Sequence, residues 1–189
     1  MANKYQIDLV KDNQIHQGDI IKNMPFYEKY NESSGKFELS ILEIPFSIVL
    51  TQECDLDNYT KEKGALKENL DKTKILHDKY LVSLLCAPLY NAEHLFSGNH
   101  LSELNIQSEK KNSEQRKYIK QNREPRYHYI EFSDDAKLVP MIIDFKHYYS
   151  VSISILESDF SRRICSLKPL YRELVSQRFT NFLSRIGLP

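Results

Sequence analysis

Short apolar runs separated by turn-forming residues recur along this chain and restrict it to a strand-based architecture. Residues 37–41 alternate apolar and polar side chains, the period of a half-buried strand, and residues 46–51 are almost continuously apolar. Short strands at turn-separated intervals are typical of a barrel or sandwich and not of βαβ units. We therefore predict an α+β fold built on a small β-barrel. The other strand-like runs are residues 18–21, 80–87, 127–132, 138–145, 148–155 and 164–167.

A turn at residues 31–35 predicts a hairpin, and the end of the chain predicts a helix. Pro169 begins an apolar stripe of helical spacing, and Gly187 fits the stop, so we expect a packed C-terminal helix over residues 169–187. A length of 189 residues, 41% of them hydrophobic, suits a single domain over residues 1–189.

Two polar segments interrupt the strand pattern and are predicted to be insertions. Residues 58–78 are lysine-rich, with a short helix expected at residues 65–70. Residues 97–126 form the second insertion, in which residues 101–121 have helix-forming composition and only a weak apolar stripe. That helix is expected to lie on the surface.

The net charge is neutral, because 26 Lys and Arg balance 26 Asp and Glu. The balance favours neither a strongly basic nucleic-acid binder nor an acidic tail. The charges are nevertheless segregated: residues 28–57 are mainly acidic and residues 110–126 mainly basic. A chain that is neutral overall can still carry a basic face.

The three cysteines, Cys54, Cys86 and Cys165, are far apart, and the polar N-terminus has no apolar signal core. No apolar run approaches the roughly 20 residues that cross a bilayer. These features predict free thiols in a reducing cytoplasm, no membrane contact and no cofactor. Abundant Asn, Lys and Ile and the absence of Trp suggest a bacterial source.

The apolar run before Thr51 opens into a polar stretch around Cys54, and strand ends commonly present reactive groups. A nucleophilic Cys54 requires a nearby cation or helix N-terminus and a histidine in reach. The adjacent carboxylates of Glu53 and Asp55 disfavour a thiolate. The alternative is a small, partly buried apolar side chain. Candidate histidine partners are His77, His94, His128 and His147.

A metal site is a second hypothesis for the same stretch. The chain has no C-x₂-C pair and no H-E-x-x-H motif, but zinc ligands can come from separate strands. Carboxylates of Glu53, Asp55 and Asp57 could hold a hard cation, or the two aspartates could form a turn. The expected zinc ligands are Cys54, Cys86 and His77.

The basic segment is a candidate nucleic-acid-binding surface. On a helix, Arg116, Lys120 and Arg123 share a face, and Tyr118 and Tyr127 lie close enough to stack on bases. The alternative is a solvated charged helix. The candidate binding residues are Arg116, Lys117, Lys120, Arg123 and Arg126.

The C-terminal helix offers a further interface. Its broad apolar stripe, including Phe179 and Phe182, is expected to face the core of the chain. The alternative is a homodimer or partner interface with Arg178 or Arg185 at its rim.

Gly18-Asp19-Ile20, the hairpin and the strand from Pro45 to Thr51 resemble the opening of the MazF/PemK-like toxin barrel. The resemblance implies a small SH3-like barrel with inserted helices and metal-independent RNA cleavage. Members of that family use an arginine just before the proline and a Ser or Thr at the strand end. Thr51 matches the second position, whereas Ile44 stands at the arginine position. The C-terminal run and the C-D-L loop also resemble uncharacterised bacterial proteins.

These observations favour a non-catalytic bacterial binding module that contacts RNA or a protein partner. One alternative is a metal-independent endoribonuclease of a toxin–antitoxin system, and another is a zinc-stabilised partner protein. The endoribonuclease would use displaced catalytic residues, with candidates Thr51, Cys54, Arg123 and Arg126.

Overall fold

The protein has an α+β fold. The computed structural model describes residues 4–9, 12–33, 35–68, 77–134 and 137–185. Its strands are β1 (Ile7–Asp8), β2 (Asp19–Ser33), β3 (Lys36–Val49), β4 (Ser83–Asn91), β5 (Tyr127–Ile130), β6 (Met141–Asp144), β7 (Tyr149–Ser152) and β8 (Arg163–Leu167). Its α-helices are α1 (Glu53–Glu68), α2 (Ala92–Ser97), α3 (Ser113–Lys120), α4 (Ile153–Ser158) and α5 (Pro169–Leu183).

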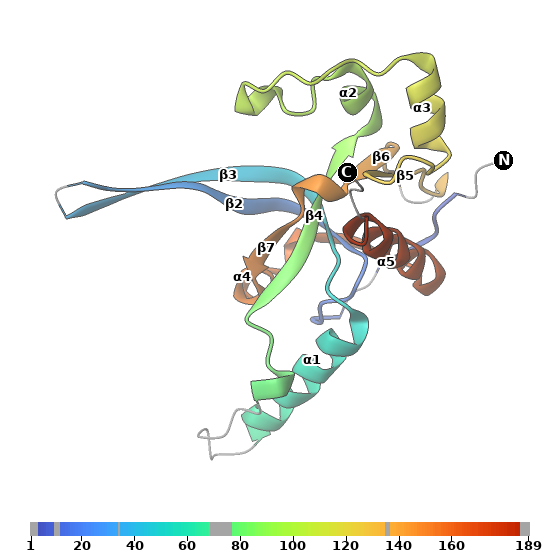
Figure 1. The fold of residues 1–189 in the computed structure, drawn as a ribbon. Coiled ribbons are helices and arrows are strands. Elements are labelled where there is room, and N and C mark those ends of the chain that lie inside the picture. The colour runs from blue at the N-terminus through green and yellow to red at the C-terminus, as the bar shows by residue number, and fades with distance from the viewer. Residues whose placement is uncertain (1–3, 10–11, 34, 69–76, 135–136, 186–189) are drawn as a thin grey trace.

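The eight strands form one open, antiparallel sheet in the order β1-β8-β2-β3-β4-β6-β5, and β7 pairs with β4. Figure 1 shows α1 at one end of the molecule and α2 and α3 at the other, with α5 between them. Among the described residues, no helix has the length and apolar character needed to span a membrane.

Tyr5 connects the two edges of the sheet, β1 and β5. Its N–H donates to the carbonyl of Glu131 at 2.7 Å, and its carbonyl accepts from the N–H of Ser133 at 3.0 Å. The result is a parallel bridge between Tyr5 and Phe132. The sheet therefore curves around a core to which α5 contributes Val175 and Phe179.

β2 and β3 form the long hairpin that the turn at residues 31–35 predicts, and Gly35 takes the positive φ of 72° that favours glycine there. At its base the hairpin buries Ile20 opposite Ile48. Its outer part, residues 27–41, projects away from the rest of the molecule (Figure 1) and is called the hairpin arm below.

The hairpin arm has one apolar face. Cross-strand neighbours share a face, and the register places Tyr27 opposite Ile41 and Tyr30 opposite Leu39. The ring of Phe37 stacks on Tyr30 with a centroid distance of 5.7 Å. These five side chains are 52–66% exposed, so the described part of the chain leaves this face largely uncovered.

The prediction that a helix forms only at residues 65–70 is wrong, because α1 begins at Glu53, within the polar stretch that follows Thr51. Glu53 and Asp55 lie in its first turn, where carboxylates interact favourably with the helix dipole. Leu56 and Tyr59 are buried and anchor the helix. The expected helix end at residue 70 lies outside the described residues.

The single helix predicted over residues 101–121 is also wrong. Leu104 ends a short 3₁₀ turn (Ser102–Leu104), Asn105 adopts a left-handed φ of 56°, and α3 begins only at Ser113. A capping box fixes that start: Asn112 accepts from the N–H of Gln115, and the Gln115 side chain accepts from the N–H of Asn112.

Two strand ends also differ from prediction. β4 continues through Pro88 to Asn91, because Pro88 lies where β4 changes partner from β7 to β6 and needs no N–H. The run 148–155 is a strand only to Ser152 and then forms α4.

The C-terminal helix is confirmed as α5, beginning at Pro169, and Ser184 is its C-cap. The expected stop at Gly187 lies outside the described residues. Of its apolar stripe, Val175 and Phe179 are buried as predicted. Leu170 and Leu174 are instead 72% and 41% exposed.

Candidate functional site

Thr51 and Cys54 lie at the junction of β3 and α1, and Cys54 is in the first turn of that helix. The helix N-terminus that a nucleophile requires is therefore present, but no cation or histidine contacts the thiol among the described residues. The Thr51 hydroxyl accepts a hydrogen bond from the N–H of Leu85 at 2.8 Å and so ties the junction to β4. The exposed Cys54 thiol lies 3.6 Å from Oε1 of Gln52 and 3.9 Å from Oδ1 of Asp55. Both of these side-chain neighbours are hydrogen-bond acceptors.

The candidate histidine partners of Cys54 are engaged elsewhere. His128 is buried and bonds the Tyr5 hydroxyl at 2.8 Å, and burial lowers its pKa to about 3. His147 pairs with Asp144. His94 is exposed on α2, and the side chain of His77 lies outside the described residues.

The metal hypothesis finds no assembled site within the described residues, where no group of three His, Cys, Asp or Glu side chains could hold an ion. Cys54 is exposed, whereas Cys86 is fully buried in β4, and burial raises its pKa to about 12. Asp55 and Asp57 are helical residues of α1 and not turn formers. The set that includes His77 stays a prediction, as does the zinc-stabilised protein.

Glu53 is the residue of this stretch with the most partners. Its carboxylate meets Nδ1 of His16 at 2.9 Å, the N–H of Gln17 at 2.7 Å and Arg172 at 2.9 Å. Asp19 accepts from the N–H of His16 at 2.8 Å. These bonds join the start of α1 to the segment before β2 and the first turn of α5. His16 and Arg172 belong to no local motif, so sequence alone gives no sign of this cluster.

The cluster predicts a pH-dependent stability. The hydrogen bond to Glu53 raises the pKa of His16 from 6.5 to about 9. A raised pKa stabilises the folded state below pH 6.5, and this contribution is lost as the pH rises through about 9. We expect the free energy of unfolding to fall by about 1–3 kcal/mol over that window.

Urea unfolding at both ends of this window checks the prediction. His16→Gln should flatten the pH dependence, whereas the exposed His94→Gln should leave it unchanged. Equal pH dependence in wild type and His16→Gln would contradict the assignment.

The basic segment ends in a structured turn that orients Lys120 and Arg123. Asn122 adopts a left-handed φ of 54° after α3. The N–H of Arg123 donates to the carbonyl of Tyr118 at 3.0 Å, and that of Asn122 to Ile119 at 2.9 Å, which is a Schellman motif. The helix therefore stops before Arg123, in contrast to the predicted continuous face.

Asn122 also fixes this turn against β5. Its side-chain oxygen accepts from the N–H of Tyr129 at 2.6 Å, and its amide donates to the carbonyl of Tyr129 at 3.1 Å. Lys120, Gln121 and Arg123 consequently occupy a defined position beside β5.

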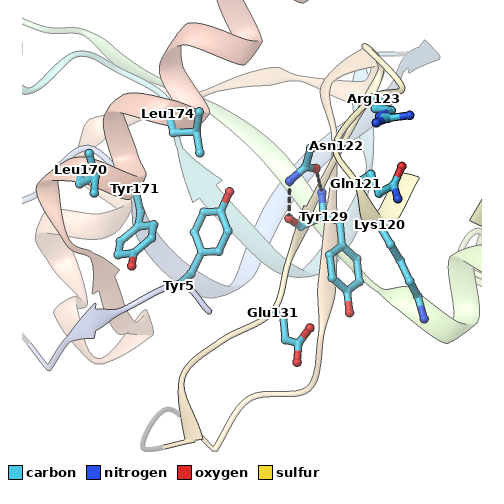
Figure 2. A pocket seen from close by; sticks show the side chains of 10 residues that line it. All are labelled: Tyr5, Lys120, Gln121, Asn122, Arg123, Tyr129, Glu131, Leu170, Tyr171 and Leu174. Atoms are coloured by element: carbon cyan, nitrogen blue, oxygen red, sulfur yellow. Dashed lines mark hydrogen bonds between the residues drawn. The ribbon is translucent and has the colours of Figure 1, made fainter. Parts of the chain in front are cut away.

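A groove of about 650 Å³ opens between this turn and α5. Figure 2 shows Lys120 and Arg123 on one side, Leu170, Tyr171 and Leu174 from α5 on the other, and Tyr5 between them. The remaining lining residues are Gln121, Asn122, Tyr129 and Glu131.

The aromatic rings of the groove differ in access. Tyr5 and Tyr129 are 6% and 7% exposed, and Tyr5 packs on Tyr171 with a centroid distance of 4.9 Å. Tyr171 is only partly buried and lies between the exposed Leu170 and Leu174. The α5 wall therefore offers a ring and apolar carbon opposite the cationic wall.

The five predicted nucleic-acid-binding residues differ in whether their charge is paired within the chain. Arg126 forms two hydrogen bonds with Asp144, at 2.8 and 2.6 Å, and Arg116 donates to the carbonyl of Lys111 and lies 3.8 Å from Glu93. Within the described residues no ion pair involves the other three. Lys117, Lys120 and Arg123 are therefore the predicted cations without a carboxylate partner among the described residues, and the ammonium of Lys120 lies 5.5 Å from the centroid of the Phe96 ring.

Arg178 and Arg185, predicted at the rim of a partner interface, both make contacts within the chain. Arg178 donates to the carbonyls of Glu124 and Tyr127, at 2.9 and 3.1 Å, and so ties α5 to the start of β5. Burial lowers its pKa. The guanidinium of Arg185 lies 4.1 Å from the centroid of the Phe182 ring.

The endoribonuclease candidates are not brought together by any contact among the described residues. Thr51 and Cys54 lie at the start of α1, whereas Arg123 and Arg126 lie between α3 and β5, at another end of the sheet (Figure 1). Comparisons with protein-family models, with curated proteins and with solved structures found no match.

Proposed function

We propose that this protein is a non-catalytic RNA-binding module whose groove between α3 and α5 holds a single-stranded segment. The observation that carries the proposal is the groove itself, with Lys120 and Arg123 facing the apolar wall of Leu170, Tyr171 and Leu174. Single strands bind where a cationic edge follows the backbone and aromatic or apolar side chains contact the bases. In this arrangement the phosphates lie along the α3 side and a base stacks on Tyr171.

The proposed barrel relationship is supported by the hairpin that follows Gly18-Asp19-Ile20 and by the Tyr5–Phe132 bridge, which joins the two sheet edges. The MazF/PemK-like resemblance would make this sheet an SH3-like barrel with inserted helices. Two observations favour binding over cleavage. Ile44 stands at the family's arginine position, and the Thr51 hydroxyl is engaged by Leu85.

The groove is tested by removing its two cations. Lys120→Gln with Arg123→Gln should weaken binding of a labelled single-stranded RNA of about 12 nucleotides by at least ~10-fold, measured by fluorescence anisotropy. The slope of log affinity against log salt should fall by about 1.4, because each lost phosphate contact removes about 0.7.

The matched control is Lys61→Gln with Lys79→Gln, two exposed lysines on α1 and the turn His77–Lys79. It should change neither affinity nor salt slope. The same samples test catalysis: RNA should stay intact on incubation. Cleavage that Thr51→Ala abolishes would favour the endoribonuclease and reject the non-catalytic proposal.

The hairpin arm supports a second candidate function, self-association with a second copy of this chain. Its five exposed apolar side chains present ~500 Å² of surface, so two arms packed face to face would bury about 1,000 Å², an area typical of a weak, reversible dimer. Identical apolar faces suit the self-complementary contact of a two-fold dimer.

Tyr30→Ser with Leu39→Ser removes one cross-strand pair from that face. We expect it to weaken the dimer at least ~10-fold, because large central side chains dominate such interfaces. Sedimentation equilibrium measures this. The control is the neighbouring pair Asn31→Ser with Glu38→Ser on the opposite face, which should not change the dimer. A monomeric wild type, or equal loss in the control, would contradict the arm interface.

A further inference from the structure

A second cavity, of about 380 Å³, lies where the base of the β2–β3 hairpin meets the segment after α2. Figure 1 shows this α2–α3 connection running over the base of the hairpin. Apolar and aromatic walls come from Phe26, Pro45, Pro88, Leu101 and Tyr148. A cavity of this size, with few polar groups, is typical of sites for small molecules.

His147 gives the cavity a fixed hydrogen-bond acceptor. Its Nδ1 lies 3.2 Å from Oδ2 of Asp144, a carboxylate with no exposed surface. Arg126 and the N–H of Lys146 hold that carboxylate in place. The facing carboxylate favours the tautomer with the hydrogen on Nδ1, which leaves Nε2 of His147 as an acceptor. Burial lowers the pKa of His147, which favours the neutral ring.

His100 supplies a second imidazole. Both of its ring nitrogens are shielded from solvent, and neither has a hydrogen-bond partner among the described residues. Its ring meets Tyr90 edge-on at a centroid distance of 4.7 Å, and burial lowers its pKa to about 4. A buried, unpaired polar atom is costly, so a ligand that bonds this ring gains that free energy.

The charges around the cavity select against anions. Glu43 and Glu103 line it, burial lowers the pKa of both imidazoles, and the charge of Arg126 is compensated by Asp144. A phosphate or carboxylate would meet like charge without a free cation. The class of ligand that suits this cavity is an uncharged, flat ring that fits between the aromatic walls and carries an N–H.

We propose that this cavity binds an uncharged nucleobase or nucleoside, stacked on its aromatic walls, whose ring N–H donates to Nε2 of His147. The site is separate from the groove, because the two have no lining residue in common. The proposal therefore does not depend on RNA binding in the groove.

Calorimetric titration of the wild-type chain with matched nucleosides tests it. Uridine or guanosine should bind, and 3-methyluridine or 1-methylguanosine, which lack the ring N–H, should bind at least ~10-fold more weakly. The corresponding 5′-monophosphates should also bind more weakly. Absence of binding by either nucleoside, or equal affinity for a methylated or phosphorylated form, overturns the proposal.

A variant series locates the site. His147→Phe should weaken nucleoside binding at least ~10-fold, whereas the exposed His94→Phe on α2 should not change it. Circular dichroism confirms that both variants are folded. Should His147→Phe fail to fold, the ligand series on the wild type still decides. Unchanged affinity in a folded His147→Phe overturns the assignment.

Discussion

Replacing Gly98 by alanine is expected to lower the free energy of unfolding by about 3 kcal/mol or more. Gly98 follows α2 with a φ of 85°, a left-handed conformation that costs alanine about 1–2 kcal/mol. A Cβ there would lie 2.2 Å from the backbone carbonyl oxygen of Ser108. The N–H of Ser108 donates to the carbonyl of Gly98, so neither segment can move without breaking that bond.

Urea unfolding with Gly64→Ala as the control measures this effect. Gly64 lies within α1, and a Cβ built there meets nothing within 4 Å. Alanine at that position should raise the free energy of unfolding by about 0.5–1 kcal/mol, because it favours the helix. Equal effects at the two glycines would show that the close approach of Gly98 to Ser108 does not constrain the fold.

Local patterns predicted the elements whose stability is decided locally. Residues 31–35 were sufficient to predict the β2–β3 hairpin, because turn chemistry sets its connection. Pro169 and the helical spacing after it were sufficient for α5. The expected surface character of the α2–α3 segment also agrees with its exposed residues.

Long-range contacts decided the features that the sequence did not reveal. α1 begins at Glu53 because His16, Gln17 and Arg172 engage that carboxylate, and these partners come from distant segments. A long-range contact also accounts for the glycine at position 18, because a Cβ there would lie 2.9 Å from Cβ of Arg172. No periodicity or spacing encodes such an approach.

Only the cationic side of the groove between α3 and α5 was predictable from the sequence. The basic composition of residues 110–126 pointed to Lys120 and Arg123, but their apolar counterpart, Tyr171, comes from α5. Arg126 shows that composition alone does not distinguish a ligand-binding cation from a structural one. Its charge suggests a phosphate contact, whereas its position opposite the buried Asp144 makes it a structural cation.

Asp144→Asn is expected to cost about 3–5 kcal/mol of unfolding free energy, the range for breaking a buried ion pair. The Asp144 carboxylate has no exposed surface, accepts two hydrogen bonds from Arg126 and one from the N–H of Lys146, and lies 3.2 Å from Nδ1 of His147. The amide removes the negative charge and points N–H donors at a guanidinium that has only donors. Arg126 is then left partly buried and unpaired, which is the main source of the loss.

A double-mutant cycle separates this cause from a general packing defect. Adding Arg126→Met to Asp144→Asn removes the stranded charge and should recover at least ~1 kcal/mol of the loss. The control is Asp134→Asn, whose side chain is 91% exposed beside Lys4 and whose removal should not move the unfolding midpoint. A loss in Asp144→Asn no larger than in that control, or no recovery in the double variant, would mean that the Arg126–Asp144 pair does not hold β5 and β6 together.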